Sequence, residues 1–371
     1  MSAPSQDDAR EAITHFATNG TLAALEPHTS GLINYSWLAS LASAGSIRSY
    51  LLQQINRHVF QRPSDVLENM LRITSHVGRR LAQERAPDPT RRVLSLVTTR
   101  DGAAGHVDAR GETWRLVPWI EGTRCAERAS TQSEARETAC AFGRFVRQLT
   151  DLPPPALHAT IPGFHDTQAR VHWLERVIGE DRAQRRTTCR EETSALLDRR
   201  ALAMALGGPP EAGGILVRPV HNDAKIANVL FDVATGEALA VVDLDTTMPG
   251  LAAHDFGDLV RSSVSDSEED ERDLARVQVR MPVFAALASG FLAGVGDALT
   301  PAERAQLVTG ARVIVFEQAV RFLADHLDGD RYYRITRPGH NLDRARAQLR
   351  LLESLETASP ELEQLVATAP S

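Results

Sequence analysis

The chain has 371 residues, of which 43% are hydrophobic and 24% are charged, so it can fold as one or two domains with a buried core. Its formal net charge of −7 favours neither a nucleic-acid backbone nor an anionic membrane surface as a partner, and we expect neither. No apolar run approaches the roughly 20 residues that span a bilayer, and the first ten residues are polar and acidic, which does not fit a signal peptide. The three cysteines are scattered, so we expect neither a disulfide framework nor a cysteine-based zinc site. The expected location is the cytoplasm.

The first 120 residues predict a small unit of strands, one long helix and further strands. Alternating aliphatic and aromatic residues indicate strands, and a capped run with helical spacing indicates the long helix. The expected elements are a helix ending near residue 17, strands at 32–39 and 49–55, a helix at 65–84, and strands at 93–98 and 113–120.

The rest of the chain predicts mainly helices. Three consecutive prolines at 153–155 and a glycine-rich stretch with two prolines at 207–214 interrupt the helical periodicity. The expected helices are 133–149, 166–178, 190–206, one near residue 254, 270–290, 301–327 and 342–356. The predicted fold class is therefore α+β, with a small sheet-rich lobe at 1–120 and a larger, mainly helical lobe at 121–371.

The segment that carries chemistry runs from His221 to Asp243. It reads His-Asn-Asp-Ala-Lys-Ile-Ala-Asn and continues into two apolar stretches joined by the turn 233–236, which predicts a β-hairpin. The hairpin is expected to bring Asn228, just before its first strand, close to Asp243, near the end of its second. Oxygen ligands gathered in this way are what Mg²⁺ requires.

This pattern is that of the phosphotransfer core of protein kinases. Asp223 is expected to accept or orient the proton of the acceptor hydroxyl, and Lys225 to face the transferring phosphoryl group. Asn228 and Asp243 are expected to hold Mg²⁺ against the phosphates of ATP. The alternative is a loop of capping Asp and Asn residues before a hairpin. Lys225 is the only lysine of the chain, and its retention inside the motif favours the catalytic interpretation.

Taken together, these residues, the Asp-Leu-Asp-Thr run that begins at Asp243 and the Asp-Phe-Gly-Asp run at 255–258 resemble the aminoglycoside phosphotransferase and choline kinase superfamily. Within it, the chain is most similar to the N-acetylhexosamine 1-kinases. The stretch 50–60 looks like the third strand of that group and its following loop, and 316–333 looks like its sugar-site region. The resemblance covers roughly residues 20 to 355 and implies a two-lobed, protein-kinase-like fold. It makes 1–120 the nucleotide-binding lobe and 121–371 the catalytic and acceptor-binding lobe.

The resemblance also implies roles for individual residues. It makes Asp223 the base and Asp243 a metal ligand, and it places Arg321 and Tyr332 on positions that contact the sugar. Without it, Arg321 would read as part of a solvated stripe of charges spaced four apart on one helix. Asp245 is a candidate ligand of the sugar or of a second metal ion, with a capping or loop role as the alternative.

The nucleotide side departs from the kinase pattern, because the third strand carries no lysine. Gln54 is expected to stand in its place, with Glu68 as the candidate helix glutamate. Since a neutral amide cannot neutralise phosphate, Mg²⁺, Lys225 or an arginine must carry more of that charge. Gly31 and Asn34 belong to the turn expected to cover the nucleotide. Backbone groups between Val117 and Trp119 are expected to meet adenine.

The leading functional hypothesis is an ATP- and Mg²⁺-dependent kinase that phosphorylates a hydroxyl of a sugar or sugar-like ring, with the anomeric hydroxyl of an N-acetylhexosamine as the favoured acceptor. One alternative keeps the chemistry and changes the acceptor to a cyclitol, aminosugar or aminoglycoside, with the acidic run 265–273 as a site for a cationic acceptor. A second alternative is a pseudokinase that binds a ligand without turnover, which the missing strand lysine favours. The partner expected in every case is a small molecule, and the sequence leaves the oligomeric state open.

Overall fold

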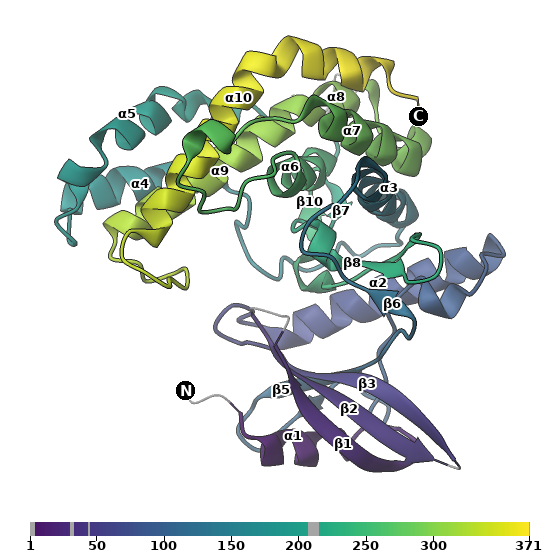
Figure 1. Ribbon diagram of the computed structural model, residues 1–371. Helices are drawn as coiled ribbons and strands as arrows, with labels where there is room; N and C mark the ends of the chain where they lie inside the picture. The colour runs from purple at the N-terminus through teal and green to yellow at the C-terminus, as the bar shows by residue number, and fades with distance from the viewer. Residues whose placement is uncertain (1–3, 30–32, 44, 207–214, 371) are drawn as a thin grey trace. The chain divides into compact units, whose positions relative to one another are not determined.

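The computed structural model describes residues 4–29, 33–43, 45–206 and 215–370 (Figure 1). Gly31 lies outside the described residues. The chain divides into two compact units, and each is built from separate stretches of sequence. The N-terminal unit comprises Met1–Arg124, Asp151–Pro162 and Leu230–Pro249, and the C-terminal unit comprises Cys125–Thr150, Gly163–Val229 and Gly250–Ser371.

A five-stranded antiparallel sheet forms the centre of the N-terminal unit. Its spatial order is β1-β2-β3-β5-β4, and its strands are β1 (Thr21–His28), β2 (Tyr35–Ser43), β3 (Ser46–Gln54), β4 (His106–Val107) and β5 (Thr113–Pro118). Helix α1 (Gln6–Ile13) packs Ala9 and Ile13 into one cluster with Trp37 and Trp114 of the sheet. Burial of these side chains ties α1 to the sheet.

The unit also contains a long helix and a small second sheet. Helix α2 (Pro63–Gln83) begins with proline at its first position, where the missing N–H costs nothing. The second sheet has the order β6-β8-β9, from β6 (Thr123–Arg124), β8 (Val229–Asp232) and β9 (Ala238–Val241). The predicted β8–β9 hairpin is confirmed: the side chain of Asp232 accepts hydrogen bonds from two backbone N–H groups of the turn, and Gly236 has a φ of 75°.

Helix α9 (Leu307–Leu327) is the centre of the C-terminal unit and packs against α4, α6 and α10. The other elements of this unit are α3 (Gln132–Leu149), α4 (Thr167–Glu180), α5 (Arg190–Asp198), β7 (Arg218–Val220), α6 (Ala252–Ser263), α7 (Met281–Val295), α8 (Pro301–Ala305) and α10 (His340–Thr368). The short β10 (Met248–Gly250) precedes α6. The predicted α+β fold class, with a sheet-rich first part and a helical second part, is confirmed.

Helix α7 is the one helix among the described residues that is long and apolar enough to cross a membrane, within Met281–Ala298, and half of that window is buried inside the chain. Its glycines lie against α3: a Cβ atom at Gly290 would come within 2.2 Å of the carbonyl oxygen of Arg136, and one at Gly294 within 2.2 Å of that of Cys140. The apolar composition of α7 is thus that of a helix packed closely against α3.

Four predicted elements are corrected. Residues 93–98 form no strand, although the Val97 N–H bonds to the carbonyl of Leu116 in β5. The helix expected from 270 begins only at Met281, since the acidic residues before it bond to arginines of other segments. The helix expected at 301–327 breaks at Gln306, and the last helix runs on to Thr368.

Candidate active site

The catalytic loop follows strand β7 in the C-terminal unit. His221 is fully buried, with its ring edge-on to Phe142 and Phe145 of α3 at 5.2 and 5.9 Å. Asp255 of α6 accepts hydrogen bonds from the backbone N–H groups of His221 and Asn222, at 2.9 and 2.7 Å. Burial raises the pKa of Asp255 to about 6, against the effect of these bonds. Asp255 therefore braces the catalytic loop.

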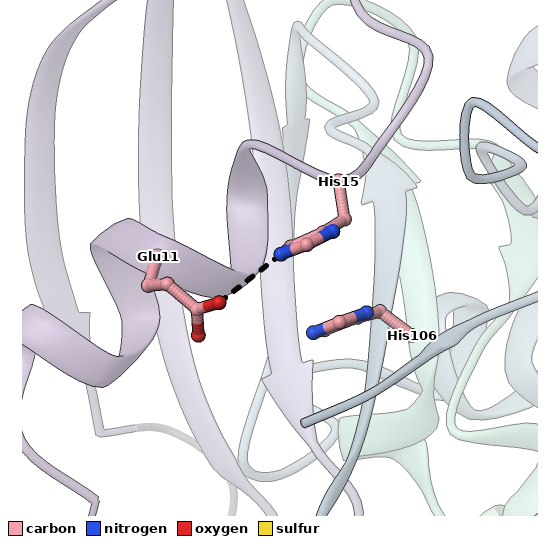
Figure 2. Close-up of side chains that lie close together, drawn as sticks. All are labelled: Glu11, His15 and His106. Atoms are coloured by element: carbon pink, nitrogen blue, oxygen red, sulfur yellow. Dashed lines mark hydrogen bonds and ion pairs between the residues drawn. The ribbon is translucent and has the colours of Figure 1, made fainter. Parts of the chain in front are cut away.

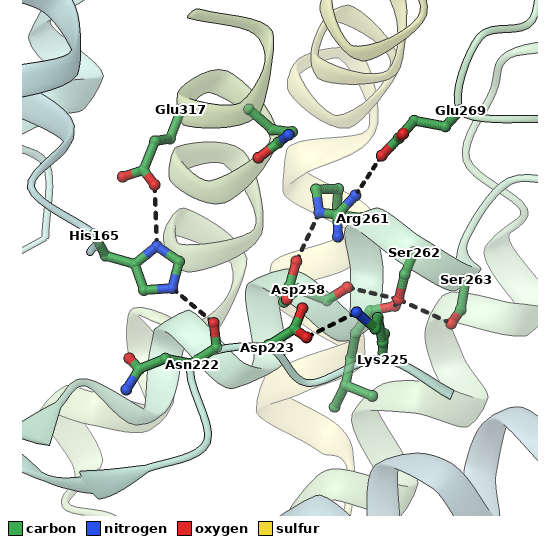
Figure 3. Close-up of polar contacts among 12 residues, drawn as sticks. His165, Asn222, Asp223, Lys225, Asp258, Arg261, Ser262, Ser263, Glu269 and Glu317 are labelled. Carbon is green, nitrogen blue, oxygen red and sulfur yellow. Dashed lines mark hydrogen bonds and ion pairs between the residues drawn. The ribbon is translucent and has the colours of Figure 1, made fainter. Parts of the chain in front are cut away.

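Both predicted catalytic residues, Asp223 and Lys225, meet in this loop with Asn228, a predicted metal ligand; Figure 3 labels the first two. The ammonium group of Lys225 lies 2.7 Å from Oδ2 of Asp223. The amide nitrogen of Asn228 donates to the backbone carbonyl of Asp223 at 2.9 Å and to Oδ2 at 3.1 Å. Burial raises the pKa of Asp223, but the nearby Lys225 outweighs it, so the pKa lies below its ordinary value. The carboxylate is therefore ionised at neutral pH and can accept a proton.

Arg261, which is paired with two carboxylates, lies beside this group. Arg261 donates from Nε to Asp258 at 2.6 Å and lies 3.4 Å from a carboxylate oxygen of Glu269. Although burial opposes the charged form, these carboxylates raise the pKa of Arg261 above its ordinary value. The fixed positive charge of Arg261 also favours the ionised form of Asp223.

A buried histidine supports the loop from the other side. His165 places Nδ1 3.1 Å from Oε1 of Glu317 and Nε2 3.1 Å from the carbonyl oxygen of Asn222 (Figure 3). Burial lowers the pKa of His165, but Glu317 outweighs it and the pKa is raised; Glu317 in turn has its pKa lowered to about 2. The charged imidazole can donate both hydrogen bonds at once. Neither His165 nor Glu317 was predicted as a site residue.

Arg321, one of the predicted sugar contacts, lies one helical turn after Glu317 at 4.0 Å. Its guanidinium carbon lies 5.7 Å from the ring centres of Phe164 and Tyr333 and 5.8 Å from that of Tyr332. The Arg321 side chain is 10% exposed, so its guanidinium is mostly shielded from solvent and lies among these three aromatic rings.

Asp325 fixes the loop that carries Tyr332. Its fully buried carboxylate accepts the backbone N–H groups of Arg331, Tyr332 and Tyr333 and the side-chain amide of Asn341, at 2.8 to 2.9 Å. Tyr332 itself is 64% exposed. Asp325 is therefore a structural support of this loop.

The remaining predicted residues belong to the N-terminal unit. Asp243 follows β9 with a φ of 59°, the left-handed conformation that Asp tolerates better than most residues. Because Asn228 belongs to the other unit, the shared Mg²⁺ site stays a prediction. Asp245 is 2% exposed; both oxygens bond to the guanidinium of Arg115, and Oδ2 also accepts the amide of Asn34 at 2.7 Å. Its role as a substrate ligand stays a prediction, while its contacts are those of a structural brace.

Arg115 is the residue on the nucleotide side that the sequence interpretation missed. It extends from β5, is 3% exposed, and bonds through Nε to Gln53 of β3 at 2.9 Å. The sequence signal was one charged residue within the buried strand Trp-Arg-Leu-Val. Asn34, predicted at the nucleotide, also accepts the backbone N–H of Asn56 at 3.0 Å.

The structure does not bring Gln54 and Glu68 together through any contact of the described residues. Gln54 is buried in β3, whereas the Glu68 side chain is 53% exposed and lies 3.0 Å from His158. Val117 is buried and pairs with β3, and Trp119 borders a pocket of about 260 Å³ between residues 90–95 and 118–121. Nucleotide contacts of these residues stay predictions.

The phosphotransferase enzyme family (APH) matches residues 24–289, more than half of the chain. The chain belongs to this family. It is therefore a phosphotransferase, and the predicted likeness to the aminoglycoside phosphotransferases is confirmed at the level of the family. The more specific resemblance to the N-acetylhexosamine 1-kinases stays a prediction.

Solved structures agree with the fold. An aminoglycoside phosphotransferase from Alicyclobacillus acidocaldarius is 16% identical, with a TM-score of 0.57 over 99% of this chain and 98% of that one. Spectinomycin phosphotransferase APH(9)-Ia, in complex with ADP and spectinomycin, is 12% identical, with a TM-score of 0.52 over 99% of both chains. An ethanolamine kinase from Plasmodium vivax is 10% identical, with a TM-score of 0.50 over 88% of this chain and 82% of that one. The likeness extends to the kinase-like fold.

Proposed function

We propose that this phosphotransferase is an ATP-dependent sugar kinase, and that its acceptor is the anomeric hydroxyl of an N-acetylhexosamine. The observation that carries the kinase assignment is the group formed by Asp223, Lys225 and Asn228 in one loop, with an ionised carboxylate at its centre. A cytoplasmic location, where ATP is available, is part of the proposal.

In the proposed reaction the acceptor hydroxyl donates its proton to the Asp223 carboxylate. The acceptor oxygen then forms the new bond to the γ-phosphorus while the bond to the β-phosphate oxygen breaks and ADP leaves. The ammonium group of Lys225, 2.7 Å from Asp223, can shift toward the phosphoryl oxygens and stabilise their charge.

The donor atoms of the loop suit a magnesium nucleotide. The Asn228 amide nitrogen donates to two oxygens of Asp223, and its amide oxygen accepts no hydrogen bond from any residue in the described part of the chain. That amide oxygen is the hard donor that Mg²⁺ prefers, and Asp243 would supply the charged ligand. When bound, Mg²⁺ neutralises phosphate charge and orients the γ-phosphate for transfer.

The lack of a lysine in β3 raises the importance of these groups. Gln54 is neutral, and the guanidinium of Arg115 is already paired with Asp245. Lys225 and Mg²⁺ therefore carry most of the phosphate neutralisation in this proposal. A moderate nucleotide affinity with intact turnover is the expected consequence.

Two observations favour a neutral sugar as the acceptor. Aromatic faces around Arg321 suit the C–H surface of a sugar ring, and the guanidinium can donate hydrogen bonds to its oxygens. The acidic run 265–273 is largely neutralised, since five of its carboxylates bond to arginines: Arg280 with Asp266, Arg128 with Glu268, Arg261 with Glu269, Arg337 with Asp270 and Arg276 with Glu271. These carboxylates offer little attraction to a cationic aminoglycoside.

The test measures ADP release with N-acetylglucosamine, N-acetylgalactosamine, myo-inositol and a cationic aminoglycoside, each with ATP and Mg²⁺. Turnover with an N-acetylhexosamine is expected, with phosphorus-coupled NMR locating the phosphate on the anomeric oxygen. A phosphate on another hydroxyl, or turnover with inositol or the aminoglycoside alone, would replace the proposed acceptor. Tight ligand binding without ADP release would identify a pseudokinase.

A further inference from the structure

Glu11, His15 and His106 form a cluster of potential metal ligands in the N-terminal unit. One ligand atom from each side chain lies within 4.8 Å of the other two. Glu11 and His15 are four residues apart at the end of α1, and their Oε1 and Nε2 atoms are 3.1 Å apart. His106 comes from β4, the edge strand of the sheet.

The two imidazole rings stack face to face, with centroids 3.8 Å apart and planes at 7°. Figure 2 shows a nitrogen of each ring at the end nearer the Glu11 carboxylate, so the three groups share one small volume.

One ring nitrogen of His106 has no hydrogen-bond partner among the described residues. This atom, Nε2, is buried. A buried, unpaired polar nitrogen costs free energy unless a ligand satisfies it. A neutral imidazole nitrogen without a proton is also the form that coordinates a metal ion.

We propose that Glu11, His15 and His106 bind a zinc-class divalent ion that joins the end of α1 to the edge of the sheet. Two imidazole nitrogens and one carboxylate oxygen suit borderline ions such as Zn²⁺, and water completes the coordination. The stacked rings must turn to aim at one ion. The Glu11 and His15 side chains are 62% and 43% exposed, so both have room to move.

The test uses untagged full-length protein, without nucleotide, so it is independent of phosphoryl transfer. One Co²⁺ per chain is expected to bind with visible d–d absorption, and Zn²⁺ is expected to displace it and to raise Tm. Mg²⁺, a hard ion, is expected to do neither. His106→Asn and His15→Asn should each weaken Zn²⁺ binding by more than about tenfold. Loss of a residue that only hydrogen-bonds to a metal ligand already lowers metal affinity by about tenfold, and loss of a ligand should cost more. His58→Asn, at an exposed histidine outside the cluster, should leave binding unchanged.

Because the His15 side chain is largely exposed, His15→Asn should fold even if His106→Asn does not. Circular dichroism checks the fold of both variants. Zn²⁺ affinity equal in the parent, His15→Asn and His106→Asn proteins would overturn the proposal, as would absence of Co²⁺ absorption. Either result would leave a stacked histidine pair beside a surface carboxylate.

Discussion

The Nδ1 atom of His165 lies 3.1 Å from Oε1 of Glu317, and both side chains are buried. This pair supports the active-site loop, because the other nitrogen of His165 bonds to the carbonyl oxygen of Asn222, next to Asp223. On its other side Glu317 lies 4.0 Å from Arg321. One polar chain thus runs from the proposed acceptor contact to the proposed base.

Replacement of His165 should lower kcat more than it changes the KM for ATP. In the His165→Asn variant the loop loses its hydrogen bond to the imidazole. Because a hydrogen bond to a charged group contributes about 1.5 kcal/mol or more, its loss should lower kcat by about tenfold. The parent should also lose activity as pH rises through the raised pKa of His165, where the ring can donate only one bond. The variant should lack that alkaline limb, and His172→Asn, at an exposed position of α4, should keep it. Matching pH profiles for all three proteins would exclude this role.

His254 makes the fold sensitive to acid. Burial, and next the charge of His165, lowers the pKa of His254 to about 3, while the unfolded chain titrates near its ordinary 6.5. Between these values the unfolded state binds more protons, so the free energy of unfolding falls as pH decreases from 6.5 toward 3. Urea titrations should show a smaller loss over this window in His254→Asn. An equal loss in both proteins would contradict the assignment.

Asp223→Asn should abolish phosphoryl transfer and leave nucleotide binding intact. Loss of a general base costs about 10²- to 10⁴-fold in rate, and an amide can still receive the hydrogen bond from Lys225. Single-turnover ADP release and calorimetry with ATP measure the two effects. Asp198→Asn, at an exposed residue of α5, is the control. Near-parent turnover would remove Asp223 as the base.

Arg321→Ala should raise the KM for the acceptor far more than the KM for ATP. The expected change is about ten- to a hundredfold, the range for lost hydrogen bonds to a charged group. Arg321→Lys should recover only part of it, because lysine lacks the planar fork of donors. Equal effects on both substrates would place Arg321 outside the acceptor site.

Arg115→Met should destabilise the protein by about 3 to 5 kcal/mol, because it leaves the buried Asp245 carboxylate without its counter-charge. Adding Asp245→Leu should restore much of that loss in urea unfolding. Arg176→Ala, at an exposed ion pair with Glu180, should change stability by less than about 1 kcal/mol. A double variant as unstable as the sum of its parts would mean that the two residues act independently.

The sequence was most informative where the chemistry is local. Asp223, Lys225 and Asn228 lie within six residues, so their spacing alone predicts the loop that the structure contains. The hairpin that follows was predicted for the same reason, because two short apolar stretches flank the turn at 233–236.

Contacts between distant residues were beyond sequence reasoning. Arg115 and Asp245 are 130 positions apart, and His165 and Glu317 are 152 positions apart. The row Glu317–Arg321–Asp325 resembles a solvated stripe when the residues are considered alone. In the structure α9 is buried on nearly all sides, so these charges satisfy one another and the loops around them.

Lys225 has a further use because it is the only lysine of the chain. Its side chain is 34% exposed and lies beside Asp223, so the only ε-amine of the molecule reports directly on the reaction centre. Reductive methylation with labelled formaldehyde would place a single side-chain NMR probe there. The protein thus carries a built-in spectroscopic reporter of ligand arrival, with no engineered tag.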